Sequence, residues 1–106
     1  MIVTSTEQVP GYRVLKALGL VRGNTIRARH IGRDILAVLR NLVGGEVYEY
    51  TKMMAESREQ AVDRMVEEAR TLGADGVVSV RFVTSMVMMG AAEIMCYGTA
   101  VSLQEE

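Results

Sequence analysis

The chain has 106 residues, of which 49% are hydrophobic and 24% charged, and its twelve Lys and Arg oppose thirteen Asp and Glu for a net charge of −1. These values predict one folded domain over residues 1–106, and they argue against disorder and against nucleic-acid binding driven by excess positive charge. No apolar run reaches the ~20 residues that span a bilayer, and a single cysteine fits a reducing compartment, so we expect a cytoplasmic protein without a membrane partner.

The first part of the chain predicts strands. Residues 1–5 are β-prone, and Pro10-Gly11 is a strong turn signal. Residues 12–21 are nearly continuous in apolar side chains, which predicts a strand covered on both faces, with a bulge at Gly19. Residues 25–29 alternate apolar and basic side chains and predict a second strand or a continuation of the first.

Two helices are expected next. Residues 31–43 carry apolar side chains three and four positions apart, and Gly44-Gly45 ends that pattern. A longer stripe predicts a second helix that ends at Gly73. Ser57 and Gln60 form a capping box that would start this helix late, but the stripe continues upstream, so we place the start near Val47.

Residues 77–87 and 92–103 predict a hairpin that turns at Gly90. The element order is then β(β)-α-α-β-β, a mixed α+β fold. Both faces of the hairpin are largely apolar, and two helices are too few to cover them. We therefore expect another subunit to bury the remaining face, and a well-folded monomer is the alternative.

Several short segments occur in an order that resembles one known family. They are Met1-Ile2-Val3-Thr4, the Gly11 turn, Arg33-Asp34, Gly44-Gly45, the helix residues Tyr50, Arg58 and Ala61, Gly73-Ala74-Asp75 and Gly98-Thr99-Ala100-Val101. The order and spacing of these segments resemble those of the YbjQ-like family over essentially the whole chain. That family is uncharacterised and labelled as heavy-metal-binding. The resemblance implies a dodecin-like α+β fold and assembly as a homopentamer.

The chain also departs from this family. It has His30 where relatives often have Asn, and Arg81, Val83 and Ser85 where relatives have acidic residues. If those carboxylates hold a cation in relatives, this chain has lost that site.

Soft-metal binding is the first chemical hypothesis. The candidate ligands are His30, Met88, Met89, Met95 and Cys96. Thioether and thiolate sulfur favour Cu(I) and similar ions, so a soft metal ion is the cofactor that these residues would hold. No CxxC and no second histidine accompany them, so oligomer symmetry would have to repeat a ligand around an axis. Core packing for the methionines and Cys96, and a surface or capping role for His30, are the alternatives.

Anion binding is the second hypothesis. Seven basic residues lie between Arg13 and Arg40, opposed only by Asp34. Arg27, Arg29 and Arg33 could bind a phosphate or carboxylate where a helix begins, and Asp34 could pair with an arginine of a neighbouring chain. The alternative is that this basic segment complements the acidic second helix, within or between subunits.

No catalytic motif occurs in the sequence, so we do not expect an enzyme. The function predicted is a homo-oligomeric binding or scaffold module that binds heavy metal, as the family resemblance implies. A module that binds a small anion at a basic subunit boundary, or a purely structural platform for a partner protein, are the alternatives.

Overall fold

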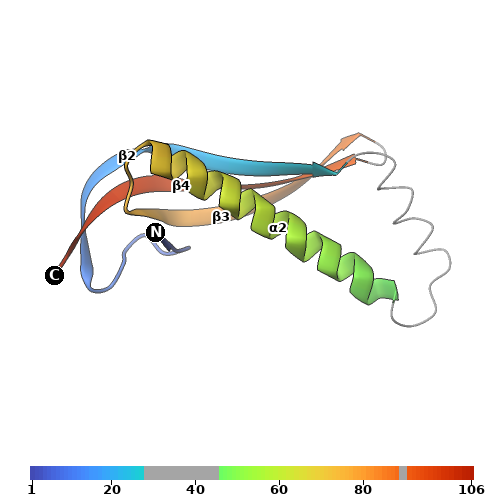
Figure 1. Cartoon of the computed structure of the whole chain (residues 1–106), viewed down its shortest axis with the longest axis horizontal. Helices are drawn as coiled ribbons and strands as arrows, with labels where there is room; N and C mark the ends of the chain where they lie inside the picture. The colour runs from blue at the N-terminus through green and yellow to red at the C-terminus, as the bar shows by residue number, and fades with distance from the viewer. Residues whose placement is uncertain (28–45, 89–90) are drawn as a thin grey trace.

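The computed structural model describes residues 1–27, 46–88 and 91–106, which form a four-stranded sheet with a long helix on one of its faces (Figure 1). The elements are β1 (Ile2–Val3), β2 (Tyr12–Arg27), α2 (Glu46–Thr71), β3 (Gly76–Met88) and β4 (Ala91–Glu105). The strand order across the sheet is β1-β3-β4-β2. β1 pairs with β3 in parallel, and the other pairs are antiparallel, so the sheet is mixed and the fold is α+β.

Helix α2 and the β3–β4 hairpin confirm the sequence predictions. The helix begins at Glu46, upstream of the Ser57 capping box, because its apolar stripe already starts there. It ends before Gly73, whose φ of 75° is the left-handed conformation that glycine adopts without steric cost. The first expected helix, residues 31–43, and the Gly90 turn lie outside the described residues.

β2 differs from the prediction in its place in the sheet. It is one strand to Arg27, as in the predicted continuation of residues 12–21, but it lies at the edge, paired only with β4. Among the described residues of one chain the predicted cover is present on one face only: Leu15 and Leu20 are exposed, because the single described helix lies on the other side. Cover of the remaining face by another subunit stays a prediction. The bulge at Gly19 is confirmed by a register shift between Ala17 and Gly19 and a φ of 140°.

The core lies between α2 and the sheet. Ala61, Met65 and Ala69 are spaced four residues apart, so they form one stripe along the helix, and all three are fully buried. They pack against side chains from three strands, which are Val21, Val77, Val80, Cys96 and Ala100.

Gly23 sets how closely the helix approaches. A Cβ atom built on Gly23 would lie 2.0 Å from the carbonyl oxygen of Ala61 and 2.5 Å from the amide nitrogen of Met65. No side chain fits between these backbones, so a glycine at this point lets α2 lie directly on β2.

The N-terminal segment continues along the outer edge of β3 beyond β1. Ser79 N donates to Thr6 O at 2.9 Å and Val80 N donates to Thr4 O at 3.1 Å. The Arg81 guanidinium donates to Ser5 O at 2.8 Å. These bonds satisfy the β3 edge at a bulge, where Ser79 has a φ of 56°.

Truncation of Met65 tests this core. Met65→Ala removes the largest fully buried side chain among the described residues, and we expect it to lower the free energy of unfolding by about 2–5 kcal/mol. Glu68→Ala, on the exposed side of the same helix, should change it by less than about 0.5 kcal/mol. Guanidinium unfolding followed by circular dichroism measures both. Equal effects of the two substitutions would contradict this description of the core.

Candidate functional site

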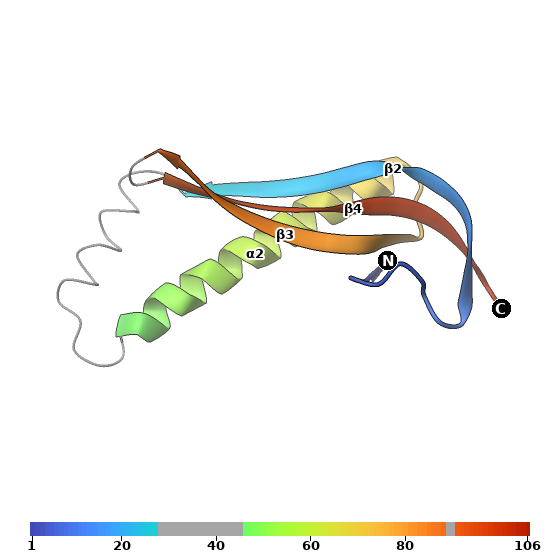
Figure 2. The same cartoon turned by 180° about the vertical axis from the view of Figure 1, so that it is seen from behind.

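The face of the sheet opposite α2 carries no helix of the described chain, and we call it the open face (Figure 2). Strand register assigns its residues. Leu20 pairs with Thr99, Ile26 with Glu93 and Val83 with Met95, whereas the buried Cys96 and Ala100 belong to the other face. The open face therefore presents large apolar side chains to solvent: Leu20 is 66% exposed, Ile26 57% and Val83 39%.

Basic and aromatic side chains share the open face with these apolar residues. Arg22 and Arg81 are both paired with Tyr97, one from each neighbouring strand. Arg81 already donates to backbone carbonyl oxygens, and Asn24 donates to Glu93 at 3.0 Å. In the part of the chain that the structure describes, Arg22 makes no ion pair. The open face thus combines apolar surface with two guanidinium groups.

The structure separates the two neighbouring sulfur ligands predicted on β4. Cys96 is fully buried under α2, whereas Met95 is half-buried on the open face, because successive residues of a strand point to opposite faces. Met88 is the last residue of β3. His30 and Met89 lie outside the described residues, so their part in a metal site stays a prediction.

The described residues do not fit a heavy-metal site within one chain. No group of three or more His, Cys, Asp or Glu side chains close enough to hold a metal ion occurs among them. Cys96 and Met95, the two described candidates that carry sulfur on β4, cannot ligate one ion together from opposite faces of the sheet. We therefore assign no metal chemistry to this part of the chain.

Burial sets the chemistry of the thiol. It raises the pKa of Cys96 above the ordinary value of 9.0, and the backbone hydrogen bond from Gly23 lowers it by less. The thiol is therefore protonated at neutral pH. A protonated, fully buried thiol is a poor nucleophile and a poor metal ligand.

The predicted anion site falls largely outside the described residues. Arg27 ends β2, and Arg29, Arg33 and Asp34 lie beyond it in residues 28–45. One contact joins this stretch to α2, but it is no charge pairing of basic strand residues with acidic helix residues: Arg64 of α2 donates to the backbone oxygen of Asn24 at 2.5 Å. The alternative that the basic segment complements the acidic helix stays a prediction. The anion hypothesis for Arg27, Arg29 and Arg33 stays a prediction.

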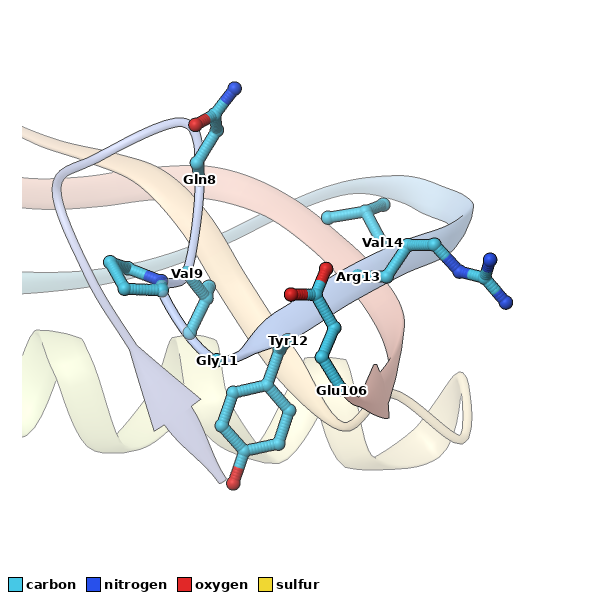
Figure 3. Close-up of a pocket in the computed structure, with 8 residues that line it drawn as sticks. Gln8, Val9, Gly11, Tyr12, Arg13, Val14 and Glu106 are labelled. Atoms are coloured by element: carbon cyan, nitrogen blue, oxygen red, sulfur yellow. The ribbon is translucent and has the colours of Figure 1, made fainter.

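A surface hollow of about 400 Å³ lies where the Pro10-Gly11 turn meets the C-terminal end of the chain. Its lining includes Gln8, Tyr12, Arg13 and Glu106. Figure 3 shows that Gln8, Tyr12 and Arg13 point in three different directions, so their polar groups do not converge on one point. Arg13 is already bound to Gln104 at 2.6 Å. This hollow therefore lacks the converging polar groups of a binding site.

Sequence reasoning did not single out the open face around Arg22. The signal was present: residues 20–26 alternate, with Val21, Gly23 and Thr25 buried and the residues between them exposed. The apolar run that precedes it, residues 12–21, instead indicates a strand covered on both faces. Period-two alternation across Gly23 would have placed Leu20, Arg22 and Ile26 together on the uncovered side.

Residues 1–104 match the model of a family described as "Putative heavy-metal-binding". The chain belongs to the YbjQ family. That match covers nearly all of the 106 residues, as the sequence resemblance implied.

Relatives of this YbjQ chain extend over archaea and bacteria. A UPF0145 protein of Methanoculleus marisnigri is 59% identical over 103 residues, which cover 97% of this chain and 96% of that one. UPF0145 protein TTHA1944 of Thermus thermophilus is 58% identical over 104 residues, which cover 98% of this chain and 91% of that one. These relatives have no assigned activity in their names, so the family remains uncharacterised beyond its description.

One solved structure supports the fold. The crystal structure of a protein of unknown function from Pediococcus pentosaceus is similar with a TM-score of 0.65 and covers 98% of both chains. At 17% identity this likeness concerns the fold alone. Among the helices that the structure describes, none combines the length and apolar character that a bilayer crossing requires.

The raised pKa of Cys96 predicts a specific pH dependence. Above about pH 9 the thiol of the unfolded chain loses its proton at a lower pH than the thiol of the folded chain. The folded chain then binds more protons than the unfolded chain, so the free energy of unfolding falls as pH rises. We expect the wild-type chain to lose more free energy of unfolding between pH 7 and about pH 10 than Cys96→Ala, which lacks this thiol. Guanidinium unfolding at both pH values measures the difference. Equal losses would show that the pKa of the thiol is the same in both states.

Proposed function

We propose that this YbjQ protein is a homo-oligomeric binding or scaffold module, not a catalyst, and that further copies of the chain cover its open face. One observation carries the proposal, namely the exposure of Leu20, Ile26 and Val83 together on one face of the sheet. Single apolar residues are normal on a protein surface, but several of them on one uncovered sheet face, with Arg22 and Asn24 between them, are typical of a mixed apolar and polar interaction surface.

The energetics favour covering this face. Complete burial of a Val, Leu or Ile side chain contributes about 1.5–3 kcal/mol relative to exposure, so three such side chains can supply a large part of an association free energy. The shape agrees with this interpretation. The radius of gyration is 17.0 Å, whereas a compact chain of about 100 residues has about 13 Å. An elongated, one-sided layer leaves much surface that a second copy can bury.

The face suits association better than the edge of β2. There, the Arg64 side chain donates a hydrogen bond to the backbone oxygen of Asn24. A charged side chain over an edge strand hinders the addition of a further strand. A contact through the face leaves these hydrogen bonds intact. Five copies, the number that the family resemblance implies, would have a mass of about 58 kDa for a chain of 11.7 kDa.

Heavy-metal binding comes to this chain from the family description, and the described sulfur donors give it no site within one chain. Any contribution of His30, Met88 or Met89 is a prediction, as is anion binding at Arg27, Arg29 and Arg33. A structural platform for another protein is compatible with the same open face. We expect no nucleic-acid and no membrane partner.

A charge placed on the open face tests self-association. Leu20→Glu puts a carboxylate where the proposal requires apolar contact, and we expect the mass in solution to fall toward that of one chain, 11.7 kDa. Size-exclusion chromatography with light scattering measures the mass. The far-ultraviolet circular dichroism of the variant should match wild type, because Leu20 lies outside the core.

Leu72→Glu is the matched control. Leu72 is also exposed, but it follows the end of α2 and is not part of the open face. This substitution should leave the mass unchanged. A wild-type mass that persists in Leu20→Glu, or one that falls equally in both variants, would contradict association through the open face.

A further inference from the structure

The only cysteine of this chain is paired across the sheet with Gly23, where helix backbone lies directly on β2. Cys96 has no exposed surface, and its neighbours across the sheet are Gly23 on β2 and Phe82 on β3. All three lie on the face of the sheet that carries α2, where Gly23 and Cys96 are buried and Phe82 is half-exposed. The thiol therefore belongs to the core cluster that also contains Met65 and Ala61.

Helix backbone lies over Gly23, the neighbour of this thiol on β2. At Gly23 the space for a Cβ atom is already occupied by the carbonyl oxygen of Ala61 and the amide nitrogen of Met65. A flexible surface side chain can move aside within nanoseconds, whereas a helix backbone moves only when the packed element moves. Access to Cys96 from this side therefore requires α2 to move off β2.

Metal capture by Cys96 would also need a thiolate and further donors. Soft ions bind the deprotonated sulfur, and burial keeps this sulfur protonated. The nearest candidate in sequence, Met95, lies on the opposite face of the sheet. Within the described ranges, no carboxylate or imidazole group joins the thiol in a set of three.

We infer that Cys96 is closed to metal ions and thiol reagents in the folded chain, and that displacement of α2 from Gly23 is the event that exposes it. This conclusion disagrees with a metal site built on Cys96, and it does not depend on self-association. A soft metal ion that reaches Cys96 binds the opened chain, so it lowers the stability of the fold instead of raising it.

Thiol reactivity tests the inference on the full chain. With 5,5′-dithiobis(2-nitrobenzoic acid), we expect native wild type to react at least ~100-fold more slowly than the chain unfolded in guanidinium, because reaction waits for opening. Gly23→Ala adds a methyl group against the backbone of α2 and should raise the native rate about tenfold or more. Gly19→Ala is the control: its added Cβ meets nothing within 4 Å, so it strains β2 without touching α2.

Circular dichroism at each stage shows whether a variant is folded, and the comparison of native with unfolded wild type holds even if Gly23→Ala does not fold. Native wild type that reacts as fast as the unfolded chain would overturn the inference. Gly23→Ala that folds and reacts no faster than Gly19→Ala would overturn the role of α2.

Cadmium provides the metal arm of the test. Thiolate-to-cadmium absorption in the ultraviolet should be absent from native wild type and should appear when the chain unfolds. Cadmium should lower the melting temperature of wild type more than that of Cys96→Ala. Immediate thiolate absorption in the native chain, with a rise in melting temperature that Cys96→Ala lacks, would show that Cys96 is a metal ligand and would overturn the inference.

Discussion

The close contact between α2 and β2 at Gly23 governs the described part of this molecule. A glycine on the inner face of β2 lets helix backbone lie where a side chain would otherwise stand. That contact brings the stripe of Ala61, Met65 and Ala69 against the strands and closes the core. Dispersion contacts and apolar burial both depend on this short separation, since interiors are close-packed.

The packing of α2 on one face of the sheet has opposite consequences for the two faces. On the covered face it encloses a single thiol, holds it protonated and isolates it from Met95 on the same strand. On the open face it leaves Leu20, Ile26 and Val83 exposed, together with Arg22 and Arg81 beside Tyr97. The chemistry of the chain is thus divided by its sheet: the reactive group is inside, and the surface suited to contact is outside.

Local patterns predicted much of the fold. The stripe at Ala61, Met65 and Ala69 gave the long helix, and Gly73 gave its end, since both depend on neighbours in the sequence. Sheet order was harder, because strand pairing joins residues far apart: nothing local showed that β2 pairs only with β4 and stays at an edge.

The candidate site was less predictable for the same reason. Cys96 and Met95 are both among the predicted soft-metal ligands, but adjacent residues of a strand face opposite ways, so one chain cannot bring them to one ion. The row of Arg22, Tyr97 and Arg81 depends on the register of three strands and could not be obtained from spacing alone.

The mass of the unmodified chain in solution tests the central claim most directly. Sedimentation equilibrium over a range of micromolar concentrations measures it without labels or substitutions. Because the described helix covers one face only, we expect a mass several times 11.7 kDa, close to 58 kDa for five copies, with dissociation on dilution following mass action. A stable single chain at every concentration, with its apolar sheet face in water, would contradict the account.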